Sequence, residues 1–201
     1  MSKKWTLLIK SIIFFALFFW GYFANSQPLG LSTYITAFQG ARVEVVFNTV
    51  DEIQSGKTVS YKTILGLTLS DQNGAAIDNF QKMYLYVSTA SASISSLNGS
   101  STIPLDRLEI TCTPLDGFAT AGPIDNFSPK VTLPASNTPI LLLDSDRPSF
   151  ESIAFNTHRV QVEFDLGVTN SLGNASPGLY YITLNFDFQG CGTWGGVCPN
   201  P

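Results

Sequence analysis

The sequence predicts an all-β fold in which antiparallel strands form a sandwich of two sheets. The chain has 201 residues, of which only 13% are charged and 12% are aromatic, and this composition favours pleated sheets over helices. Beyond the N-terminus, short apolar alternations recur between turn signals and no stretch keeps a helical period. Seven or more strands of this kind are typical of a two-sheet sandwich.

Residues 1–26 are predicted to be a secretory signal peptide. An apolar run over Ser11–Phe23 follows two early lysines, and Ala24 and Ser26 are the small residues expected just before a cut at Gln27. In the alternative, Trp5–Phe23 is an uncleaved membrane anchor, since it is nearly long enough to span, but Lys10 interrupts it and leaves an apolar run too short for a bilayer core of about 30 Å. We therefore expect an exported protein of the periplasm, cell surface or extracellular space, with no membrane span after cleavage.

Cleavage would remove three lysines and no acid, which takes the formal net charge from −4 to −7 over the remaining 175 residues. An acidic chain without a basic patch argues against a nucleic-acid partner. The length is ample for one domain with a hydrophobic core. We expect that domain over residues 27–188 and a Gly- and Cys-rich tail over residues 189–201.

The earlier strands are expected at short intervals along the chain. Their predicted ranges are Tyr34–Phe38, Arg42–Asn48, Thr58–Leu69, Lys82–Thr89, Leu105–Thr113, Lys130–Leu133 and Ile140–Leu143. In the fourth range, Met83, Leu85 and Val87 alternate with Lys82 and two tyrosines, which separates an inner from an outer face. Asn73-Gly74 suits a hairpin turn. Any helix is expected to be a single turn near Asp78–Gln81.

The most regular alternation lies between His158 and Phe188, and these residues are expected to form the central core strands. Apolar residues at even positions from Val160 to Leu166 alternate with charged or amide residues. The same parity holds from Tyr180 to Phe188, and Gly167–Gly178 supplies the turn-rich connection.

Three segments carry a family resemblance. They are "KMYLYVST", "SLNGSSTIPLDRLEIT" and the closing "SPGLYYITLNFDF". Over about half of the mature chain, the sequence resembles secreted bacterial β-sandwich proteins of the fimbrial and spore-coat U-like kind. The matching residues are Ile103, Pro104, Leu105, Leu108, Pro177, Gly178 and Tyr180. Those families often place a cysteine in the first strand, whereas this chain has none before Cys112.

The resemblance implies an immunoglobulin-like sandwich that assembles into, or decorates, a cell-surface filament. Its partners would be other surface or pilus subunits, including further copies of itself. Leu29, Leu31, Ile35 and Ala37 lie at even spacing near the mature N-terminus and form a candidate donor strand, which would add main-chain hydrogen bonds to a neighbour's sheet. In the alternative, these residues form the first strand of their own domain, as strands usually do.

A second hypothesis is a carbohydrate-binding module or adhesin. Flat aromatic side chains with polar groups beside them are typical of sugar sites. The candidates for an exposed ligand or partner face are Tyr84, Tyr86, Tyr181 and Trp194. In the alternative, the three tyrosines form cross-strand pairs that stabilise the sheet.

The three cysteines leave more than one pairing open. A bridge between Cys191 and Cys198 would close a small loop in the glycine-rich tail, and an exported chain permits it. Cys112 alternates with Ile110 and is expected to face the core, where a free thiol behaves as a small hydrophobe. Bridges from Cys112 to either of the other two also remain open.

No enzymatic activity, cofactor or metal is predicted. His158 is the sole histidine and is expected to be exposed at a strand edge, and no catalytic or nucleotide-binding motif is present. Three cysteines and one distant histidine do not suit a four-ligand zinc site. The carboxylate pairs Asp51-Glu52 and Asp144 with Asp146 are interpreted as solvated loop acids.

Overall fold

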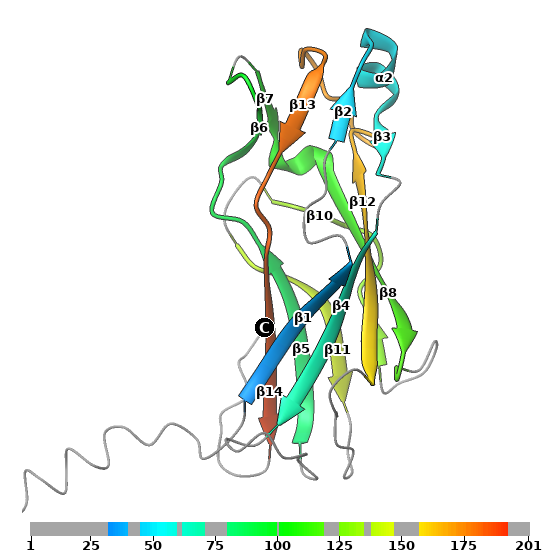
Figure 1. The fold of residues 1–201 in the computed structure, drawn as a ribbon, viewed down its shortest axis with the longest axis vertical. Helices are drawn as coiled ribbons and strands as arrows, with labels where there is room; N and C mark the ends of the chain where they lie inside the picture. The colour runs from blue at the N-terminus through cyan, green and yellow to red at the C-terminus, as the bar shows by residue number, and fades with distance from the viewer. Residues whose placement is uncertain are drawn as a thin grey trace, which may run out of the picture.

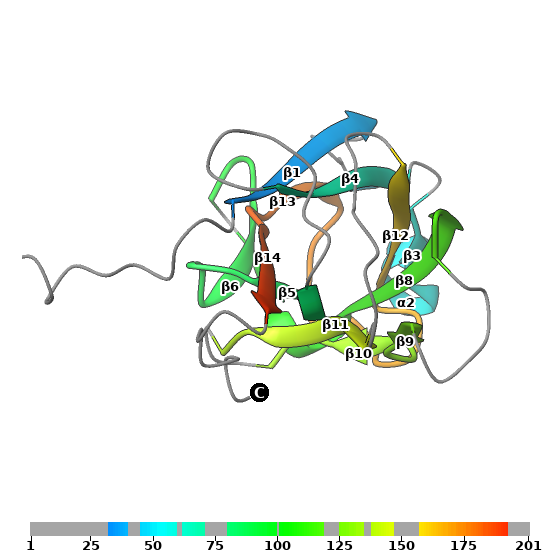
Figure 2. The same cartoon turned by 90° about the horizontal axis from the view of Figure 1, so that it is seen from below.

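The computed structural model describes residues 32–39, 45–59, 62–70, 80–99, 101–118, 125–134, 138–146 and 157–192. Within these ranges the chain consists mostly of antiparallel strands, which confirms the all-β prediction, but they form three sheets instead of the expected two. Figures 1 and 2 show two sheets surrounding a common interior in the lower body, and a third sheet standing above them beside α2 (Val50–Ser55). The helices of the described part are all too short to cross a membrane.

The main sheet has six strands. Their order is β1 (Ser32–Gln39), β4 (Thr63–Ser70), β12 (His158–Leu166), β8 (Leu108–Asp116) and β10 (Val131–Thr132), with the short β3 (Lys57–Thr58) also paired to β12. The β12 strand pairs with β8 from Arg159 to Leu166 and, on its other side, with β4 from His158 to Val162, so the expected central role of its apolar alternation is confirmed.

The two smaller sheets have four strands each. The facing sheet contains β14 (Asn185–Gly192), β5 (Phe80–Ser88), β11 (Ile140–Asp146) and β9 (Asp125–Phe127), in that order. The cap sheet contains β2 (Val45–Phe47), β13 (Gly178–Tyr181), β6 (Ser93–Ser96) and β7 (Thr102–Pro104). One continuous cluster of buried apolar side chains joins all three sheets, including Phe47 of the cap sheet, Leu67 of the main sheet and Leu85 of the facing sheet.

The final predicted strand is divided between two sheets. Its first part is β13 of the cap sheet and its second part is β14 at the edge of the facing sheet, and neither pairs with β12. Ile182, Thr183 and Leu184 connect the two parts outside any strand. The alternation itself is correct, because the even-numbered side chains turn inward and the odd-numbered ones are mostly exposed. A period of two specifies which face is buried, whereas the partner strand depends on the rest of the chain.

Several boundaries also differ from the prediction. Residues Leu105–Arg107 form a 3-10 turn (η1) before β8, and the predicted strand Thr58–Leu69 is divided between β3 and β4. The short strands β6, β7 and β9 were not predicted, because Ser93–Ser96 and its counterparts lack a long apolar alternation. The β14 strand includes Gln189–Gly192, the first residues of the expected tail.

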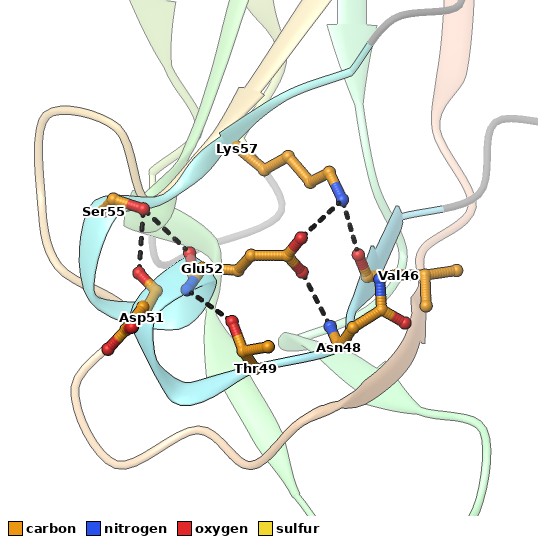
Figure 3. A network of polar contacts seen from close by, with 7 residues as sticks. All are labelled: Val46, Asn48, Thr49, Asp51, Glu52, Ser55 and Lys57. Atoms are coloured by element: carbon orange, nitrogen blue, oxygen red, sulfur yellow. Dashed lines mark hydrogen bonds and ion pairs between the residues drawn. The ribbon is translucent and has the colours of Figure 1, made fainter.

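The α2 helix lies at a carboxylate pair that the sequence suggested was in a loop. Thr49 is the N-cap, and its Oγ1 accepts a hydrogen bond from the backbone N–H of Glu52 at 3.2 Å. Glu52 Oε2 in turn accepts from the backbone N–H of Asn48 at 2.7 Å, as Figure 3 shows. This resembles a capping box, whose Thr-x-x-Glu spacing was visible in the sequence. The predicted helical turn near Asp78–Gln81 is wrong at Phe80 and Gln81, which belong to β5, and its first two residues lie outside the described ranges.

Lys57 of β3 links the start of α2 to β2. Its Nζ donates a hydrogen bond to the carbonyl of Val46 at 3.0 Å and lies 3.6 Å from Glu52 Oε1 (Figure 3). The backbone N–H of Asn48, and then Lys57, hold the pKa of Glu52 below its usual value. Asp51 and Glu52 also lie in the first turn of the helix, where negative charge is favourable. These two acids are therefore part of a helix start and do not form a separate site.

Candidate functional site

The candidate donor strand lies at the edge of the main sheet. In β1, Ile35 lies opposite Leu67 of β4 and Ala37 lies opposite Leu65, so the segment pairs within its own chain. Leu29 and Leu31 lie outside the described residues. The other side of β1 faces β14, and the two strands lie side by side although no ladder joins them in the described part of the chain (Figure 2). Two strand edges therefore meet here without being paired to each other.

A cavity of about 690 Å³ opens near the end of this seam. Its walls come from all three sheets and from the connection between β13 and β14. The residues that line it are Ala37, Val45, Val59, Thr63, Leu65, Ile94, Leu97, Leu108, Phe164, Leu166, Leu179, Tyr180, Tyr181, Ile182, Thr183, Leu184 and Phe186.

The cavity reaches from the surface into the core. Leu97 is 67% exposed and Tyr181 is 53% exposed, whereas Leu65, Leu108 and Leu166 are buried. The hydroxyl group of Tyr180 donates a hydrogen bond to the carbonyl of Ser176 at 2.7 Å and accepts one from its N–H at 3.1 Å, so it is already satisfied. The lining as described contains no charged side chain. This cavity is therefore suited to an apolar ligand or an apolar side chain.

The sequence candidates are distributed over different surfaces. Ala37, from the proposed donor strand, and Tyr181, from the proposed ligand face, both line the cavity. Tyr181 is exposed as expected, but Tyr84 is only 4% exposed, so its predicted exposure is wrong. It lies in an inner strand of the facing sheet, opposite Asp144 of β11 on one side and Gln189 of β14 on the other. Trp194 lies outside the described residues.

No protein-family model, curated protein or solved structure matches the chain.

A separate, polar surface surrounds Tyr86 on the outer face of the facing sheet. Its ring centroid is 6.1 Å from that of Tyr84, and Asp187 lies opposite it on β14. Partial burial raises the pKa of Tyr86, and the nearby Tyr84, Asp144 and Asp187 raise it further, so its hydroxyl group stays protonated well above neutral pH. Within the described part of the chain, the buried Oδ1 of Asp144 has no hydrogen-bond partner.

His158 is only 8% exposed, which corrects the prediction of an exposed strand-edge histidine. Its ring packs edge-on against Phe118 at 5.1 Å, and its Nδ1 lies 2.8 Å from Thr157 Oγ1. The alternation along the strand could have predicted this burial, since residue 158 lies on the same inward face as Val160 and Val162. Its contacts are those of a packed side chain at the start of β12.

Cys112 is a buried free thiol, as expected from its position on β8. Burial raises its pKa to about 12, so the thiol stays protonated and unreactive at neutral pH. Because this thiol is free, neither of the two bridges considered from Cys112 is formed in the structure. Cys198 lies outside the described residues, and only the backbone of Cys191 is described, so the predicted tail bridge remains a prediction.

A cluster of charged groups joins β10 to β12 and β8. Lys130 pairs with Asp165 and lies 3.7 Å from Glu109, which also accepts a hydrogen bond from Thr169 at 2.8 Å. Burial would raise the pKa of Asp165, but hydrogen bonds from Lys130 and Thr58 outweigh it and the pKa is lowered. Each of these acids is paired, which favours a structural role. The described residues contain no group of three His, Cys, Asp or Glu side chains placed to hold a metal ion.

Proposed function

We propose that this protein is an exported structural or adhesion component of a bacterial cell surface that assembles by exchanging its first strand between copies. The immunoglobulin-like sandwich and the filament implied by the fimbrial and spore-coat U-like resemblance are part of this proposal. The observation that carries it is the position of β1, which among the described residues is paired on one side only, to β4.

An edge strand of this kind is suited to exchange. The ladder between β1 and β4 runs from Ser32 opposite Ser70 to Gln39 opposite Ile64, and β1 of a second copy would make the same bonds. Exchange of identical elements changes few contacts, which makes it a low-cost route to assembly. Ile35 packs against the core, so the vacated position would leave an apolar groove that favours refilling.

Removing the strand tests this proposal. Deletion of residues 27–37 from the mature protein is expected to abolish the multimers present in unheated, non-reduced material from the native envelope, as measured by size. A synthetic peptide of residues 27–39 is expected to bind the deleted protein, and the same peptide with Ile35→Asp is expected to bind at least about tenfold more weakly, since a buried charge opposes its insertion. A full-length protein that is monomeric under all these conditions would exclude strand exchange.

Adhesion through a glycan is the second candidate function, and the surface around Tyr86 supports it. The half-buried Tyr86 ring offers an apolar face, while the exposed Asp187 provides carboxylate oxygens that can accept hydrogen bonds from sugar hydroxyls. Tyr181 lies on the cap sheet, so it belongs to a different surface.

Single substitutions separate these surfaces. Tyr86→Ala is expected to abolish retention on a glycan array, and Tyr181→Ala is the matched control that should leave retention unchanged. Tyr84 is unsuitable for this test because its removal would disturb a buried position. Equal retention by the wild type and the Tyr86→Ala protein would remove the Tyr86 surface as a glycan site.

A further inference from the structure

We propose that the cavity between the three sheets binds a single unbranched hydrocarbon chain, such as the acyl chain of a fatty acid or lipid. This inference goes beyond assembly and adhesion and depends on neither. It rests on the size of the cavity, on the chemistry of its walls and on the path from its mouth to the core.

The size is that of a small-molecule site. A volume of about 690 Å³ lies within the range of roughly 300–1,000 Å³ found for ligand pockets. An unfilled apolar cavity is costly, because its walls lose packing contacts on one side and water gains too few hydrogen bonds there. A bound hydrocarbon would restore those contacts and offset the cost.

The walls select against a polar ligand. Aliphatic and aromatic side chains form most of the lining, and its polar members are two threonines and two tyrosines. Of these, Tyr180 already directs its hydroxyl group to Ser176. A sugar or a charged metabolite would lose its hydration here without sufficient replacement partners, which is unfavourable.

The route into the cavity suits a flexible chain with its head group outside. Exposed Leu97 and Tyr181 belong to the outer part of the lining, whereas Leu108 and Leu166 belong to the buried part. The terminal methyl group would thus lie among buried leucines, and any polar head group would remain in solvent. The walls of the site come from segments as distant in the sequence as Ala37 and Phe186, so the site exists only in the folded protein.

The test uses the full mature chain after removal of bound lipid. The uncharged dye N-phenyl-1-naphthylamine should bind with increased fluorescence, and palmitic acid should displace it. In parallel, the protein is incubated with phosphatidylcholine vesicles and separated from them before the dye is added. Dye binding that is lost after palmitic acid alone indicates free fatty acids, and dye binding that is also lost after the vesicles indicates membrane lipid.

Two leucine-to-arginine substitutions, one inside the cavity lining and one outside it, provide a matched pair. Leu184→Arg, in the cavity lining, is expected to weaken dye and palmitate binding by at least about tenfold, because the new charge enters an apolar wall. Leu115→Arg, on β8 away from the lining, should leave binding unchanged. Ala37→Trp provides a second, uncharged test, since the larger side chain should fill part of the cavity and lower affinity in a protein with an unchanged circular dichroism spectrum.

Three outcomes would overturn the proposal. They are failure of the wild type to bind either probe, equal binding by the Leu184→Arg and Leu115→Arg proteins, and loss of dye binding whenever the protein multimerises. The last result would assign the cavity to a segment of a second copy. Sedimentation measured in the same samples keeps the two proposals separate, because a protein that binds palmitate as a monomer supports this site without supporting strand exchange.

Discussion

Phe164→Ala is expected to lower the free energy of unfolding by about 3 to 5 kcal/mol, a large part of the stability of a typical domain. The Phe164 side chain is only 6% exposed and lies on β12, the central strand of the main sheet. It packs in the common core and forms part of the cavity wall, so truncation would enlarge a space that is already poorly filled. The loss combines the transfer of the aromatic ring to water with the cost of the added empty volume.

Urea unfolding of three variants measures this effect. Phe186→Ala is expected to cost less, about 1 to 2 kcal/mol, because Phe186 is half-buried on the edge strand β14. Glu163→Gln, next to Phe164 but on the outer face, should change stability by less than about 1 kcal/mol, because its ion pair with Lys62 is partly exposed. If Phe186→Ala were the more damaging of the two aromatic changes, the assignment of β12 as the central strand would be wrong.

Gly56→Ala is expected to lower the free energy of unfolding by about 3 kcal/mol or more. Gly56 follows α2 with a φ of 70°, in the left-handed region that penalises a side chain. A Cβ atom at this position would also overlap the backbone of Gly167 and Val168. Because those atoms belong to a main chain, relief requires α2 and β3 to move away from the end of β12.

Gly99→Ala separates the two causes. Gly99 has a nearly identical φ of 69°, but a Cβ atom there would meet nothing within 4 Å. The substitution should therefore cost only the backbone strain, about 1 kcal/mol. Thermal unfolding of both variants provides the comparison. Equal losses would mean that the close approach between residues 56 and 167 does not exist in solution.

The faces of the longest strands could be predicted from the sequence. The alternation of Val160, Val162 and Phe164 assigned the buried face of β12, and that of Met83 and Leu85 did the same for β5. Cys112 was placed in the core by the same reasoning. The alternation of side chains is a local property of an extended backbone, so it can be read without knowing the neighbours. The Thr49-x-x-Glu52 cap was equally local, although it was missed.

The burial of Tyr84 required the neighbouring strands. Its alternation correctly placed it away from Met83 and Leu85, but its exposure depends on which side chains stand beside it. Asp144 and Gln189 occupy those places, and they come from β11 and β14, far along the chain in sequence. An outer-face position in an inner strand can thus be nearly closed to solvent.

Local pattern therefore determined that this chain forms β-strands and which side of each long strand turns inward. Tertiary structure alone decided that Gly178–Tyr181 and Asn185–Gly192 join different sheets, and that Ala37, Leu108 and Phe186 surround one cavity. The physical reason is that backbone hydrogen bonds are nearly the same for every pair of strands. The choice of partners, and the spaces left between them, depends on how all the side chains pack together.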